Sequence, residues 1–201
     1  MLDVRDVARH LVRIGYEPDS PEESVLLCPL RLQKLLYYCQ GWGLALLGEP
    51  LFSQAIEAWP KGPVVPDVWQ LFAGKRDGIT PEQAGEPTVE FPQTVLSLLN
   101  MVWREYSRFR PQELVDMTHA EPAWKDARGA LPPAAPSNSV LSLETMKQYF
   151  SDLARRSVRS GEFPVALPSE VWQADQQFEK GNGRGVPLRD AVRLAKSARA
   201  S

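Results

Sequence analysis

The chain has 201 residues, of which 43% are hydrophobic and 24% are charged, a composition typical of a soluble globular protein with one domain or two small ones. Its net charge of −2 argues against a protein whose whole surface binds nucleic acid. Charged side chains interrupt the first 15 residues, which excludes a secretory signal peptide. The two cysteines, Cys28 and Cys39, have apolar neighbours, and we expect free thiols in a cytoplasmic protein, with a disulfide as the alternative.

The first two predicted helices occupy the first quarter of the chain. Asp3 can cap a first helix, whose apolar residues follow one face until Gly15. A second helix is predicted from about Pro29, because proline is favoured in the first turn, to Gly48. Its uncharged stretch, residues 35–47, is too short and too polar to span a membrane. We therefore expect a central core helix with a polar and aromatic edge.

The middle of the chain alternates helices with proline-rich turns. Prolines at positions 60, 63 and 66 exclude a helix interior, so a short extended piece is predicted at 56–59 and a turn at 61–62. The sequence GKRDGITPEQAGEPT is predicted to be a loop. Further helices are predicted at 66–72, from Pro92 to about Tyr106, in PQELVDMTH, in PAWKDARG, and after Ser142.

The last 51 residues differ in charge from the rest of the chain. Residues 151–201 contain nine Lys or Arg and six Asp or Glu, whereas the remainder is acidic. One more helix is predicted around Trp172 and Phe178, followed by a glycine-rich break and a basic helix over 187–200. The predicted fold is mainly α, a compact multi-helix domain over residues 1–150 with at most short extended segments, and a C-terminal helical extension over 151–201.

The sequence contains no arrangement of residues that indicates an enzyme, a metal site or a cofactor. His10 fits a solvated helix face, and His119 with Asp116 makes a poor metal site, so a structural role is predicted for His119. Glu57 and Glu121 look like isolated carboxylates. The motifs of nucleophile elbows and phosphate-binding loops are absent from the sequence. We therefore expect a binding protein that needs no cofactor.

Two sequence blocks resemble the Panacea-domain family, which includes SocA-type antitoxins and GepA-like phage-associated proteins. The first is LRLQKLLYYCQGWGLALLGEPLFSQAIEAWPKGPVVPDVW, and the second is LVDMTHAEPAWKDARG. The chain departs from the family pattern at Pro60, where a basic or aromatic residue is usual. The family-motif positions that we expect to be structural are Leu35, Leu36, Gln40, Trp42, Gly62, Pro63, Thr118, His119 and Trp124.

This resemblance implies an antitoxin that neutralises a cognate toxin by binding it directly. The alternatives are an adaptor that delivers the toxin to a protease, as the SocA branch does, and a DNA-binding transcriptional regulator. The expected partner is the toxin, with a protease as a second partner in the adaptor alternative; neither a membrane nor a nucleic acid is expected. The predicted toxin-binding residues lie on the edge of the second helix, near the proline turn and in the basic tail: Gln33, Lys34, Tyr37, Tyr38, Trp59, Lys61, Arg189 and Arg193.

Overall fold

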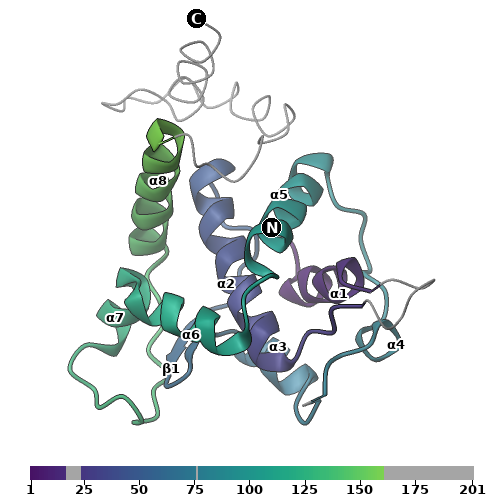
Figure 1. The fold of residues 1–201 in the computed structure, drawn as a ribbon, viewed down its shortest axis with the longest axis horizontal. Helices are drawn as coiled ribbons and strands as arrows, with labels where there is room; N and C mark the ends of the chain where they lie inside the picture. Colours follow the sequence, from purple (N-terminus) through teal and green to yellow (C-terminus); the bar gives the residue numbers. More distant parts are fainter. Residues whose placement is uncertain (17–23, 76, 161–201) are drawn as a thin grey trace, which may run out of the picture.

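The computed structural model describes residues 1–16, 24–75 and 77–160. Within these ranges the fold has eight helices and one two-stranded hairpin (Figure 1), which confirms the mainly α prediction. The predicted helices around Trp172 and over 187–200 lie outside the described residues. The elements are α1 (Val4–Ile14), α2 (Pro29–Leu46), β1 (Glu57–Trp59), β2 (Gly62–Val64), α3 (Pro66–Leu71), α4 (Pro81–Ala84), α5 (Gln93–Tyr106), α6 (Pro111–Ala120), α7 (Pro122–Arg128) and α8 (Leu143–Ser160).

Helix α2 is the central element of the fold. It packs against α1, α5, α6, α8 and β2, and Figure 1 shows α8 on one side of it and α1 with α5 on the other. Its sequence favours a helix because Pro29 occupies the first turn and no β-branched residue follows within the helix. Gly41 lets α8 approach closely, since a Cβ atom at this position would collide with the ring of Phe150. The predicted central core helix is therefore confirmed.

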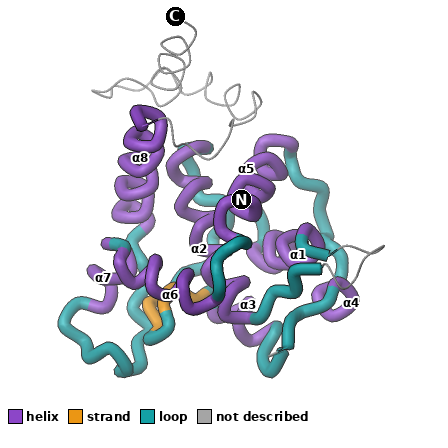
Figure 2. Tube along the Cα trace, in the orientation of Figure 1, coloured by secondary structure: helices purple, strands orange, loops and turns teal. Residues whose placement is uncertain are grey.

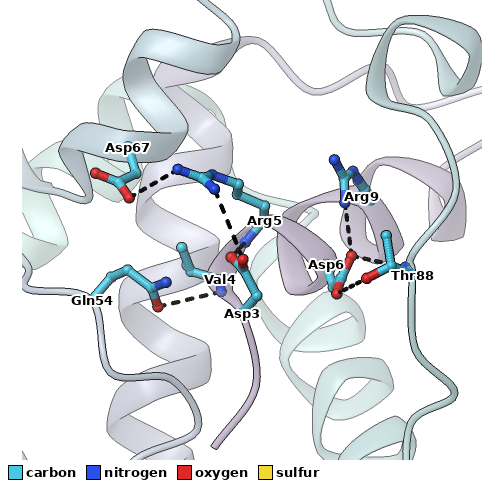
Figure 3. Close-up of polar contacts among 8 residues, drawn as sticks. All are labelled: Asp3, Val4, Arg5, Asp6, Arg9, Gln54, Asp67 and Thr88. Atoms are coloured by element: carbon cyan, nitrogen blue, oxygen red, sulfur yellow. Dashed lines mark hydrogen bonds and ion pairs between the residues drawn. The ribbon is translucent and has the colours of Figure 1, made fainter.

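Helix α1 is fastened to its neighbours by two polar clusters (Figure 3). The buried Asp6 carboxylate accepts hydrogen bonds from Arg9 and from both the N–H and the hydroxyl of Thr88. Burial alone would raise the pKa of Asp6, but these three bonds outweigh it and the pKa lies below its ordinary value. Arg5 forms an ion pair with Asp67 at 3.3 Å. Together these contacts tie α1 to α3 and to the segment that precedes α5.

The hairpin lies beside α6 and α7 (Figure 2). Its strands pair antiparallel, with Glu57 opposite Val64 and Trp59 opposite Gly62, so Pro60 and Lys61 form the turn. Pro60 fits there because proline presets the φ angle of a turn residue. A bridge between Glu57 and Val140 adds a short third segment on the other side of β1. The predicted extended piece is confirmed, but the turn lies one residue earlier than predicted, at 60–61 and not 61–62, because Gly62 already pairs with Trp59 in β2. The departure from the family pattern at Pro60 is accommodated by this turn.

Two helices differ from the predicted elements, α4 and α8. The segment 74–88, predicted to be a loop, contains the short helix α4, which Thr80 and Gln83 begin with a reciprocal capping box. Helix α8 crosses the boundary predicted at residue 150, and Ala154 still belongs to the buried core.

Both cysteines are free thiols, as predicted. In the described ranges, no helix is both long and apolar enough to cross a membrane.

Candidate functional site

The polar side chains of α2 are buried, which corrects the prediction of an exposed edge. Gln33, Lys34, Tyr37 and Tyr38 were expected to contact the toxin, yet each is at most 1% exposed. The expectation failed because the hairpin, α6 and α8 cover the sides of α2 that sequence periodicity assigned to solvent. In this conformation these four side chains cannot touch a partner protein directly, and their contacts are internal.

Gln33 and Lys34 hold the hairpin against α2. The Gln33 Oε1 atom accepts a hydrogen bond of 2.7 Å from the N–H of Val65, directly after β2. The Lys34 ammonium group donates a bond of 2.8 Å to the carbonyl of Pro63 within β2. These side chains satisfy backbone groups that β1 does not reach, so the side of β2 away from β1 is closed by α2.

Lys34 is an unusual buried amine. Its side chain is inaccessible to solvent, and it belongs to none of the ion pairs in the part of the chain that the structure describes. Burial lowers the pKa of Lys34 to about 7, because a charged amine is poorly stabilised away from water. Burial also lowers the pKa of His119, and the nearby Lys34 adds to this effect. The interior around the hairpin therefore favours neutral side chains.

Gly62 allows the hairpin to approach Lys34 and Thr118. Its φ angle of +93° lies in the region that favours glycine. A Cβ atom there would also lie 2.8 Å from both Lys34 Nζ and Thr118 Oγ1. Thr118 is fully buried, and its hydroxyl donates to the carbonyl of Val115. The structural role expected for Gly62 and Thr118 follows from this close packing.

Gln40 of α2, like Gln33 and Lys34, forms hydrogen bonds with backbone groups of another segment. Its side-chain oxygen accepts bonds from the N–H groups of Leu51 and Phe52, and its amide nitrogen donates to the carbonyl of Phe52. The three bonds measure 3.0 to 3.2 Å. Gln40 thus replaces a strand partner for the segment that follows α2. Leu35 and Leu36 are fully buried beside it in the hydrophobic core.

Glu121 is the centre of a buried hydrogen-bond network, although it looks like an isolated carboxylate in the sequence. It lies between α6 and α7 and accepts hydrogen bonds from the hydroxyls of Tyr37, at 2.5 Å, and Tyr38, at 3.1 Å. Burial raises the pKa of Glu121 to about 7, although the two hydroxyls act in the opposite direction. Tyr38 also stacks on Tyr106, whose hydroxyl accepts a bond from the indole of Trp42. Only tertiary contacts reveal this role, because 83 residues separate Tyr38 from Glu121.

The second sequence block fastens α6 and α7 to the hairpin. His119 stacks on Trp124 with 3.9 Å between ring centroids, and the Trp124 indole donates to the carbonyl of Trp59. Arg128 is buried, and its guanidinium donates to the carbonyl of Ala58 at 3.4 Å. Arg128 was not among the predicted site residues, although it ends the motif. The two blocks therefore meet around β1 and β2.

The remaining predicted toxin-binding residues have different positions. Lys61 is exposed at the hairpin turn, and Trp59 is half-buried beside it. Trp59 lines an open, mostly apolar groove of about 450 Å³ with Glu57, Pro60, Pro136, Ser137 and Asn138. Arg189 and Arg193 lie outside the described residues. Residues 1–16, 24–75 and 77–160 contain no cluster of three or more His, Cys, Asp or Glu side chains that could hold a metal ion.

Comparison with known proteins agrees with the resemblance seen in the sequence. Residues 32–125 match the family described as "Antitoxin SocA-like, Panacea domain". Antitoxin SocA from Caulobacter vibrioides (strain NA1000 / CB15N) is 39% identical over 72 residues, which make up 36% of this chain and 36% of that protein. The chain therefore spans about a third of the length of this curated relative. No solved structure matches the chain. Most of the two blocks that surround the hairpin lies within the matched segment, which confirms that residues 32–125 resemble the Panacea domain of SocA-like antitoxins.

Proposed function

We propose that this chain is an antitoxin that neutralises a cognate toxin by binding it in a stoichiometric complex, without turnover of its own. The match of residues 32–125 to the SocA-like family supports the antitoxin role, because both the family and the matched relative are named as antitoxins. The toxin is the implied partner.

The observation that supports direct binding is the accessible surface around the hairpin. The polar residues of α2 fix the hairpin from inside, so Trp59 and the exposed Lys61 are held on a rigid support. Rigid aromatic and proline residues bordered by polar groups are common at the centres of protein interfaces, because they lose little conformational entropy on binding. A binding function therefore needs no rearrangement of the core.

The test is a titration of the toxin with this chain. The protein encoded by the reading frame next to the gene for this chain is purified and used as the toxin. We expect the two proteins to co-elute at one fixed ratio in size-exclusion chromatography with light scattering. In a purified system without protease, the toxin's activity should fall linearly and vanish at that same ratio. Complete inhibition by a strongly sub-stoichiometric amount would contradict a binding mechanism.

A growth assay separates direct neutralisation from the adaptor alternative. We expect co-expression to rescue growth equally in hosts with and without the major cytoplasmic proteases, while the toxin itself stays at its full cellular level. Rescue that disappears with one protease, together with toxin that disappears only when this chain is present, would show delivery for degradation and contradict the proposal.

A further inference from the structure

The first half of the loop between α7 and α8 is held in place by the buried side chain of Arg128. Beside its bond to Ala58, the Arg128 guanidinium donates to the carbonyls of Pro132, Pro133 and Ala135, at 2.5, 3.1 and 2.7 Å. Figure 1 shows this loop projecting from the body next to β1. A proline-rich segment fixed by three charge-assisted bonds has little freedom left to lose when it binds a partner.

The end of this loop forms an open strand edge. Ala58 N–H donates to the carbonyl of Ser139, and Leu141 N–H donates to the carbonyl of Ile56, both at 2.8 Å. Because these groups alternate along an antiparallel pair, the N–H and C=O of Val140 point away from β1. No described residue bonds to either group, and the Val140 side chain is 59% exposed. The opposite edge of the hairpin is closed by Gln33 and Lys34, so a further strand can add only at Val140.

The surface beside this edge is apolar and uncharged. Residues 129–142 contain no charged side chain, although a quarter of the chain is charged. Three of the large hydrophobic side chains that the described part of the chain exposes lie on this loop or just after it: Leu131, Val140 and Leu143. The same loop contributes Pro136 to the groove, together with Trp59 and Pro60 of the hairpin. Exposed apolar side chains on a loop that also lines an apolar groove are typical of an interaction site.

Glu57 contributes a carboxylate group to the lining of the groove. It is the one ionisable residue that lines the groove, and it takes part in none of the ion pairs found among the described residues. Its carboxylate accepts a bond of 2.7 Å from the Trp59 indole. Since Glu57 lies directly opposite Val140, a strand added at Val140 would place a side chain in the same row, about 10 Å away. A lysine or arginine side chain spans most of that distance.

We propose that an extended segment of the toxin adds as a strand beside Val140, inserts an apolar side chain into the groove at Trp59, and pairs a basic side chain with Glu57. The open edge requires an extended occupant, and the carboxylate of Glu57, the one ionisable group that lines the groove, favours a basic side chain. This inference rests on the proposed function, because the toxin is the partner.

Three variants and one hydrogen-exchange measurement test the inference, with the protein from the adjacent reading frame as the probe. Val140→Lys should weaken its binding by at least about tenfold, because the added ammonium group would pair with Glu57 in the same row and repel the basic side chain of the toxin. Glu57→Gln keeps the acceptor for Trp59 and should weaken binding by about 3–10-fold, with a smaller loss at high salt. Val89→Lys is the matched control, since Val89 is 46% exposed on a distant loop, and it should bind like the wild type. All three should keep the melting temperature.

Amide exchange followed by NMR reports on the strand itself. The Val140 amide should exchange rapidly in the free protein and become protected in the complex, whereas the Leu141 amide, bonded to Ile56, should be protected in both. Wild-type binding with an unprotected Val140 amide, or unchanged affinity in Val140→Lys, would overturn this inference and leave the proposed function standing. Failure of the wild-type chain to bind the probe would overturn both.

Discussion

Gly62 is the residue at which the hairpin and α2 come closest. Two separate constraints act there: a positive φ angle, and two polar atoms 2.8 Å from the place a Cβ atom would occupy. The chain offers a control that carries only the first constraint. Gly74 has a φ angle of +82°, and no atom lies within 4 Å of its Cβ position.

Gly62→Ala should lower the free energy of unfolding by about 2–4 kcal/mol, since backbone strain and crowding of Lys34 and Thr118 both contribute. Gly74→Ala should cost only about 1 kcal/mol, because strain acts there alone. Urea denaturation of both variants measures the difference. Equal losses would show that the close approach to Lys34 is relaxed at little cost.

At the scale of elements, the helices could be predicted from sequence more fully than their surroundings. The limits of α1 follow from Asp3 and Gly15, and the hairpin turn from the prolines around it. Helix α4 was missed even though its capping box, Thr80 with Gln83, is a readable signal. A four-residue helix has too short an apolar pattern to stand out from a loop.

The candidate site was harder to predict, because its contacts join distant parts of the chain. Polar residues of a helix are assigned to solvent by default, but Lys34 and Gln33 bond to backbone groups 29 and 32 residues away. Glu121 finds its tyrosine partners more than 80 residues away. Trp59 and Lys61 were predicted to bind the toxin because they lie near a rigid proline turn, and the structure leaves Lys61 exposed and Trp59 half-buried. The open edge at Val140 depends on a pairing that no local pattern encodes.

The loop between α7 and α8 depends on one residue of α7, and this dependence can be tested. Arg128→Lys keeps the charge but cannot reproduce the bonds from two nitrogen atoms to the Ala58, Pro132, Pro133 and Ala135 carbonyls. We expect a loss of roughly 2 kcal/mol and faster cleavage of the loop by a nonspecific protease. Arg155→Lys is the control, because Arg155 is exposed and pairs with Asp152 on its own helix. Equal cleavage of both variants would show that Arg128 does not fix the loop.

At the scale of the whole molecule, the described residues already contain an extensive core. It begins with Val4 in α1 and reaches Ala154 in α8. Deletion of residues 182–201 should therefore leave the melting temperature unchanged. The prediction from the sequence is that the truncated chain loses affinity for the toxin, because the basic tail contributes contacts. The full-length double variant Arg189→Gln/Arg193→Gln tests the contribution of charge alone. Wild-type affinity for the toxin in both the truncated chain and the double variant would show that the tail does not contribute to binding.

Two buried groups, Glu121 and Lys34, make the stability of the fold depend on pH. Glu121 has a pKa raised from 4.5 to about 7, so the folded state binds more protons and Glu121 lowers stability as the pH rises through this range. Lys34 has a pKa lowered from 10.5 to about 7, so the unfolded state binds more protons and stability rises between about pH 7 and 10.5. His10 and His119, whose pKa values are lowered by burial, oppose the Glu121 effect below neutrality. Differences between variants separate these contributions better than the wild-type curve does.

Glu121→Gln should therefore gain stability relative to the wild type between pH 5 and pH 8, by up to about 3 kcal/mol, because glutamine cannot ionise. Lys34→Met loses the bond to Pro63 at every pH, but its stability relative to the wild type should decrease from pH 7 to pH 9, by about 2–3 kcal/mol. The difference changes in the direction opposite to that of Glu121→Gln. As the pH rises, the buried amine of the wild type loses its proton, so the wild type gains stability that Lys34→Met does not gain. Urea denaturation at pH 5, 7, 8 and 9 measures both differences. Parallel curves for wild type and variants would mean that these two side chains keep their ordinary pKa values, and that water reaches the interior around the hairpin.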